Sequence, residues 1–189
     1  MSLDSNALIT LADLKAYLGS VPADSDAVLE TLINQASGLV RTSLDRDLIQ
    51  ATYTNLLLDG PDSEYLYLPN WPVSELTGVY EDDVLLTEGT DYMVYAARGY
   101  LRRLDGKWPK GSQNIKVSSH KGGYLIAAVP RDIQALVMNK VAKEWQKQKG
   151  SMWGQTSRNL GDGSMNFEFD LAFTEDEETV LMPYRRLLA

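Results

Sequence analysis

The spacing of apolar residues near the start of the chain predicts a short helix over residues 11–18. Thr10 is suited to the N-cap, with a carboxylate three positions later that can satisfy free backbone N–H groups. Gly19 and Pro22 then favour termination. Three leucines at helical spacing carry this prediction: Leu11, Leu14 and Leu18.

A longer apolar repeat predicts a second helix, which begins at Asp24 or Ser25 and continues to about Leu44. A face this wide must be buried, and we interpret it as packing on other helices of the same domain. Its members recur at intervals of three and four: Val28, Leu29, Leu32, Ile33, Ala36, Leu39, Val40 and Leu44.

The helical period disappears between about residues 51 and 119, where short β-patterned segments alternate with turns. Arg98-Gly99 is typical of a hairpin turn. Turns about every eight to twelve residues predict a small antiparallel sheet or partial barrel. The expected strands cover residues 53–57, 65–68, 73–80, 84–86, 91–96, 100–104 and 115–119.

A third helix is predicted from Val129-Pro130-Arg131 to Lys149, because proline is well tolerated at a helix start. One of its rows is apolar and another holds three lysines. The next segment, Gly150 to Ser164, has the composition of a loop or a mobile segment. Residues 165–169 alternate as in a strand, and a last helix is expected over about residues 175–188, with Pro183 causing a kink or an early end.

These elements predict an α+β fold: a helical core of two N-terminal helices plus the helix near 131–149, with an inserted antiparallel β-rich region. The expected boundaries are 8–48 and 129–149 for the core and 50–125 for the insertion. Residues 150–189 are expected to form a flexible C-terminal segment with a short terminal helix.

Charge and composition narrow the function classes. The chain has 189 residues, a formal net charge of −8 and no cysteine. An acidic protein is poorly suited to gripping DNA phosphates, and without cysteine it has neither disulfides nor a thiolate zinc site. The sequence also lacks an apolar run long enough for a bilayer and a signal-like N-terminus, so we expect a cytosolic product without membrane contact.

The sequence does not present a recognisable catalytic motif. His120, the single histidine, stands at a strand end without a triad pattern, and no phosphate-binding glycine loop occurs. Asp59, Asp62 and the pair Asp82-Asp83 resemble solvated turns more than a calcium loop. We therefore expect no enzyme activity, no cofactor and no metal. Trp71 and Trp108, each followed by proline, are interpreted as packing residues.

The order of these motifs resembles the head–tail connector family of tailed bacteriophages, also called head-completion or adaptor proteins. The resemblance covers about residues 8–149. It is carried by Leu11-Ala12-Asp13-Leu14-Lys15-Ala16-Tyr17-Leu18-Gly19, Leu32-Ile33-Asn34-Gln35-Ala36-Ser37, Glu88-Gly89-Thr90-Asp91-Tyr92, Gly122-Gly123-Tyr124 and Val129-Pro130-Arg131-Asp132-Ile133.

The resemblance implies a structural role in the virion neck, reached after assembly in the host cytoplasm. Members form a closed ring of about twelve subunits. The ring docks on the portal protein and offers a platform to a stopper or tail-completion protein. DNA passes through the lumen without sequence-specific binding, and an acidic lumen would let it slide.

Several residues are candidate contacts with a neighbouring subunit or partner. The lysine row of the third helix could meet another subunit, the acidic segment 175–178 of the same chain, or only solvent. Aromatic and long side chains in the tail could order on docking or pack on the domain. The candidates are Lys140, Lys143, Lys147, Met152, Trp153, Tyr184 and Arg185.

Two other function classes remain open from the sequence. One is a small hydrolase that acts on carbohydrate or nucleotide through carboxylates converging in the β region. The other is a monomeric β-sheet binding module. An enzyme should show a concave pocket with perturbed carboxylates, whereas a connector should show flat subunit faces.

Overall fold

The computed structural model describes residues 2–19, 21–149, 157–160, 163–166 and 173–186. The chain divides into two compact units. A helical unit contains residues 1–44 and 130–184, and a β unit contains residues 45–129 and 185–189. Helices and antiparallel sheets are both present, and seven of the described strands fall in the β unit, so the predicted α+β class is confirmed.

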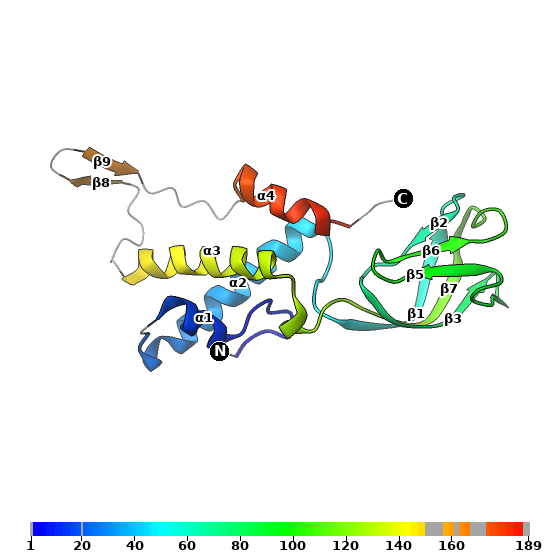
Figure 1. Ribbon diagram of the computed structural model, residues 1–189, viewed down its shortest axis with the longest axis horizontal. Coiled ribbons are helices and arrows are strands. Elements are labelled where there is room, and N and C mark those ends of the chain that lie inside the picture. The colour runs from blue at the N-terminus through cyan, green and yellow to red at the C-terminus, as the bar shows by residue number, and fades with distance from the viewer. Residues whose placement is uncertain (1, 20, 150–156, 161–162, 167–172, 187–189) are drawn as a thin grey trace. The chain divides into compact units, whose positions relative to one another are not determined.

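Among its described residues, the helical unit has four α-helices (Figure 1): α1 (Leu11–Leu18), α2 (Asp26–Leu44), α3 (Arg131–Lys149) and α4 (Glu175–Leu181). The first helix begins as the sequence predicts, because the Asp13 backbone N–H donates to Thr10 Oγ1 at 3.0 Å. It ends at Gly19, whose φ of 78° favours a residue without Cβ. Within the described ranges, no helix is long and apolar enough to cross a membrane.

The core of the helical unit is the set of apolar rows that the sequence predicts. α3 contacts both α2 and α4, and α1 contacts α2 and α3. Val28, expected on the buried face of α2, is instead 38% exposed, because it lies at the edge of a stripe that is narrower than predicted. The fully buried side chains come from all four helices: Leu14, Leu29, Ile33, Val40, Leu44, Ile133, Val137 and Leu181.

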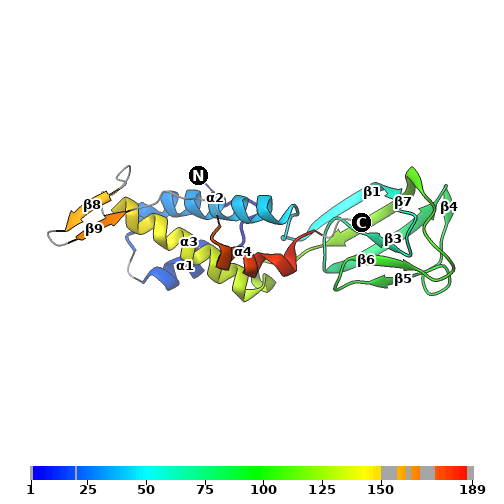
Figure 2. The ribbon, with the colours of Figure 1, turned by 90° about the horizontal axis from the view of Figure 1, so that it is seen from above.

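The β unit consists of two antiparallel sheets (Figure 2). One has the order β1-β7-β3-β4 and the other β2-β6-β5. Their strands are β1 (Ala51–Gly60), β2 (Tyr65–Tyr67), β3 (Val73–Glu81), β4 (Val84–Leu85), β5 (Tyr92–Tyr95), β6 (Tyr100–Arg103) and β7 (Gly111–Gly122).

A single apolar cluster fills the β unit. It draws on both sheets, through Leu66 and Leu101 from one and Val79 and Val117 from the other. Trp108 is fully buried in this cluster, which agrees with its interpretation as a packing residue. Such a core, rather than strand propensity, stabilises strands as short as three or four residues.

The larger sheet has an irregularity that runs across three strands. Asn55 in β1 and Gly78 in β3 have left-handed φ values of 51° and 57°, and both fall opposite Ser118 of β7. A Cβ on Gly78 would lie 2.6 Å from Ser118 Oγ, so this position accepts only glycine without movement. Left-handed residues within strands typically bend a sheet.

Several elements differ from the sequence-based prediction. β7 begins at Gly111 rather than residue 115, because the Asn114 side chain accepts from the Gly60 N–H at 2.8 Å and extends the pairing with β1. The segment 150–164, expected to be a loop, contains β8 (Ser157–Leu160), which pairs with β9 (Gly163–Asn166). Backbone pairing of this kind needs no apolar pattern. Residues 167–169 of the expected last strand lie outside the described residues.

The last helix ends earlier than residue 188, as the proline allowed. α4 ends at Leu181, and a 3-10 turn over Met182–Tyr184 contains Pro183. Its start is a capping box that the sequence analysis missed. The Thr174 N–H donates to Glu177 Oε2 at 3.0 Å, and the Glu177 N–H donates to Thr174 Oγ1 at 3.3 Å.

Candidate assembly surfaces

The predicted lysine row meets the acidic start of α4 within the same chain. Lys140 Nζ lies 3.0 Å from Glu177 Oε2, and Lys143 Nζ lies 3.9 Å from Glu177 Oε1. Lys140 is only 12% exposed and also lies over the Phe173 ring, 4.7 Å from its centroid. Of the alternatives that the sequence left open, the structure therefore places Lys140 and Lys143 beside the acidic segment.

The ionisation of Glu177 is controlled by these neighbours. Burial by itself raises the pKa of this carboxyl group, but the Thr174 backbone N–H, Lys140 and Lys143 together lower it below its ordinary value. Glu177 is therefore ionised at neutral pH and acts as an ion-pair partner. A general acid would need the opposite shift.

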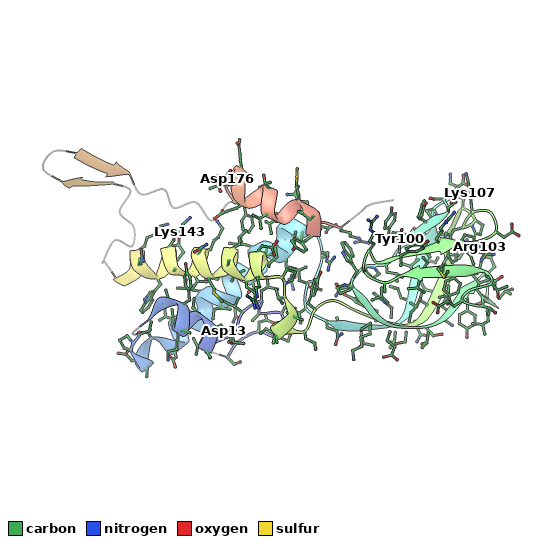
Figure 3. All side chains as sticks on the ribbon, viewed as in Figure 1. Asp13, Tyr100, Arg103, Lys107, Lys143 and Asp176 are labelled. Carbon is green, nitrogen blue, oxygen red and sulfur yellow. The ribbon has the colours of Figure 1, made fainter. Side chains whose placement is uncertain are left out.

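A groove of about 430 Å³ lies between α3 and α4. Leu136 and Val180 contribute apolar walls, and Asp132, Lys143 and Asp176 contribute charges. Lys143 on α3 and Asp176 on α4 are labelled in Figure 3. The groove is concave, as an enzyme site would be, but it lies outside the β region where the hydrolase alternative expected converging carboxylates.

The remaining predicted contact residues are dispersed. Lys147 pairs with Glu144 on its own helix at 2.7 Å. The Tyr184 hydroxyl donates to Asp132 Oδ2 on α3 at 2.9 Å and thereby ties the C-terminal turn to α3. Arg185 is exposed. Met152 and Trp153 lie outside the described residues.

An aromatic surface that the sequence analysis did not single out covers the outer side of the smaller sheet. Tyr100 is its centre, stacked on Tyr95 at 4.7 Å between ring centroids and in edge contact with Tyr65 at 5.3 Å. Figure 3 labels Tyr100 on β6. We name this surface the tyrosine face; its members are Tyr65, Tyr67, Met93, Tyr95, Tyr100 and Arg102.

Strand alternation explains why these side chains share one face. In β2, β5 and β6 the residues between them, Leu66, Val94 and Leu101, are directed into the apolar cluster. The signal was present in the sequence as Tyr65-Leu66-Tyr67, a strand that is apolar on both sides. It became a surface only once the register paired Tyr67 and Tyr95 with Tyr100.

The β unit also contains a buried cluster of polar side chains. His120 is fully buried and stacks on Tyr53, with the ring centroids 5.6 Å apart. Burial lowers the pKa of its imidazole, and the backbone of Asn70 opposes part of that shift. Arg46 is 5% exposed, lies over the Trp71 ring and donates to the Trp71 carbonyl; burial lowers its pKa to about 10.

These surfaces do not assemble into a recognisable reaction centre. The His120 side chain is fully buried, and the Glu177 carboxylate is ion-paired with Lys140 and Lys143. Among the described residues, no group of three or more histidine, cysteine, aspartate or glutamate side chains is placed to hold a metal ion. What the arrangement offers chemically is two kinds of contact: an ion-paired groove on the helical unit and an aromatic face on the β unit.

Comparison with known proteins gives these surfaces a context. The model of the head completion protein family matches residues 7–187. No curated protein matches the chain significantly. A solved structure of the neck of an empty gene transfer agent particle, computed with C6 symmetry, has a similar chain with a TM-score of 0.58 and 17% identity. The match covers 100% of this chain and 94% of that one.

Two related structures show the same likeness. A chain in the virion of the native gene transfer agent particle has a TM-score of 0.57 at 17% identity. A chain in the native neck computed with C12 symmetry has a TM-score of 0.56 at 16% identity, and both matches cover 100% of this chain and 94% of the other. The TM-scores, all above 0.5, establish a shared fold. The match of the family model over nearly the whole chain confirms the resemblance seen in the sequence: this chain belongs to the head completion protein family.

Proposed function

We propose that this head completion protein is a structural subunit of a head–tail connector ring in the virion neck, assembled from copies made in the host cytoplasm. The observation that carries the proposal is the family match over residues 7–187. The similar chain in a neck computed with C12 symmetry supports a cyclic assembly of about twelve copies. The ring would dock on the portal protein and present a platform to a stopper or tail-completion protein.

The division of the chain supports separate tasks for its parts. The helical core, 8–48 and 129–149, would provide the frame, and the β-rich insertion, 50–125, would provide an outer contact surface. Residues 150–189, including Met152 and Trp153, would contribute partner contacts. Exposed Lys143 and Arg185 are better placed to reach a partner than Lys140, which is enclosed by Glu177 and Phe173.

The charge of the protein suits a passage for DNA. A ring of subunits that each carry a net charge of −8 repels phosphates rather than holding them. DNA can then slide through the lumen without sequence-specific binding. The proposed mechanism is geometric and involves no chemical step, which fits the ion-paired state of Glu177 in the groove.

Light scattering on this chain, alone and mixed with a portal protein from the same genome, tests this function. A ring-sized species or a stoichiometric complex with the portal is the expected result. An unrelated acidic protein of similar mass, mixed with the same portal, controls for charge-driven association. A monomer that persists at high concentration and ignores the portal would overturn the proposal.

A further inference from the structure

The tyrosine face has a composition that is uncommon on a solvent-exposed sheet. Tyr65 and Tyr95 are each 38% exposed, and Met93 is 45% exposed. Tyrosine, methionine and arginine are the residue types enriched at protein interfaces, because they bury large areas at a small cost in conformational entropy. A contiguous aromatic face of this kind marks an interaction surface.

Two arginines lie on or beside the tyrosine face. Arg102, on the face itself, has 45% of its side chain exposed, and its Nε lies 3.5 Å from Glu64 Oε2. Arg98, in the turn that leads into β6, is also exposed. Arg98 and Arg102 outnumber Glu64, the carboxylate that pairs with Arg102. A partner surface should therefore be acidic and apolar.

The same unit exposes a surface with these properties. The turn between β3 and β4 consists of Asp82 and Asp83, and β4 follows with Val84 at 64% and Leu85 at 59% exposure. We name these four residues the acidic hairpin. Both aspartates have left-handed φ values, 46° and 63°, as a two-residue hairpin turn requires. The Asp82 N–H donates to the Asn114 carbonyl at 2.9 Å, which holds the tip in a fixed position.

We propose that the acidic hairpin of one copy docks on the tyrosine face of the next copy. The inference rests on the proposed ring function and assigns one contact within it. Both surfaces are exposed in a single chain, so neither covers the other. A ring needs a head-to-tail contact between two different surfaces of the same protein. Val84 and Leu85 supply the apolar insert, while Asp82 and Asp83 meet the rim arginines.

Disulfide trapping tests this contact sharply, because the chain has no cysteine of its own. Leu85→Cys and Met93→Cys are made as separate full-length variants and mixed in equal amounts under mild oxidation, with and without the portal. The expected product is a mixed dimer, enriched about tenfold over either homodimer, because disulfides form only between Cα atoms within about 7 Å. A chain carrying both cysteines should give a ladder of linked oligomers.

Leu57→Cys is the matched control. Leu57 lies on β1 of the larger sheet and is 48% exposed, so its reactivity resembles that of the test positions. The contact would be overturned if the Leu85→Cys and Met93→Cys mixture gave no more mixed dimer than a mixture with Leu57→Cys, in a sample that still assembles. The proposed ring function would not be affected by that result. Absence of any assembly, with or without the portal, would overturn both proposals.

A charge variant provides an independent measurement on a folded protein. Asp82→Asn combined with Asp83→Asn keeps the turn, since asparagine also tolerates left-handed φ. Self-association should weaken about tenfold and lose part of its salt dependence. Asp45→Asn is the control, because Asp45 is exposed and has a φ of 52°. Equal association of the double variant and the control would overturn the assignment.

Discussion

Glu177 combines two roles that substitutions can separate. Its carboxylate accepts a hydrogen bond from the Thr174 N–H in the capping box, and it forms ion pairs with Lys140 and Lys143. Glu177→Gln keeps an oxygen that can accept the capping hydrogen bond but removes the charge. Glu177→Ala removes both. The two variants therefore divide the stabilising free energy of this site between helix capping and electrostatics.

The expected magnitudes follow from the exposure of each partner. The pair with Lys140 is mostly buried, at 12% and 17% exposure, so we expect about 1 kcal/mol. The pair with Lys143, which is 68% exposed, should contribute no more than a few tenths. Losing the carboxylate half of the capping box costs about 0.5–1 kcal/mol. We predict losses of about 1 kcal/mol for Glu177→Gln and about 2 kcal/mol for Glu177→Ala.

Urea unfolding followed by far-UV circular dichroism measures these differences. Glu175→Gln, at an exposed position in the same helical turn, is the control for general effects of first-turn charge. A double-mutant cycle with Lys140→Met isolates the ion pair, with an expected coupling of about 0.5–1.5 kcal/mol. A Glu177→Gln protein that matches the control within about 0.3 kcal/mol would refute the reasoning.

The pH dependence of the same site has a definite sign. Because the pKa of Glu177 is lowered in the folded state, its ion pairs stabilise the protein fully above pH 4.5, its ordinary value. That contribution is lost as the pH falls through the lowered folded value. Glu177→Gln should remove this part of the acid dependence, while the dependence at neutral pH stays the same.

Further predictions concern other parts of the fold. Because the pKa of His120 is lowered in the folded state, the free energy of unfolding should fall as the pH drops below 6.5. His120→Phe keeps the stack on Tyr53 and should remove this part of the pH dependence, as measured by urea unfolding at several pH values. Gly78→Ala should lower the free energy of unfolding by about 2–4 kcal/mol, because of left-handed strain and the clash with Ser118. Gly38→Ala, in the open middle of α2, should raise it by about 0.5–1 kcal/mol in the same urea assay. Tyr184→Phe should cost about 1 kcal/mol of stability through the lost hydrogen bond to Asp132, as measured by urea unfolding.

The helical part of the fold was predictable because its signals are local. Thr10, Gly19 and Pro22 mark ends within a few residues of the leucines that they delimit. The apolar rows of α2 and α3 repeat over five turns, so a single exception such as Val28 does not alter the assignment. Pro183 likewise predicted a kink or an early end in the last helix, and the helix stops at Leu181.

The features that the sequence did not predict depend on contacts between residues that are distant in sequence. β7 starts at Gly111 because Asn114 bonds to Gly60, a partner that no local pattern names. The lysine row was recognised, but only the packing of α4 on α3 decides that Lys140 meets Glu177. The roles of the predicted contact residues toward other proteins stay predictions, and the residue boundaries of the predicted domains do as well.

The stability of the β unit does not by itself explain why tyrosines occupy the outer side of the smaller sheet. Leu66, Val94 and Leu101 already supply the burial that holds the smaller sheet on its core. Polar residues on the outer side would keep that core and improve solubility. Clustered tyrosines on the outer side do not add to the core, and they lower solubility while they are exposed. Another protein surface that covers them would remove this cost. A copy that presents Val84 and Leu85 beside two aspartates provides such a cover, because it removes the aromatic rings from water and neutralises the rim arginines in one contact.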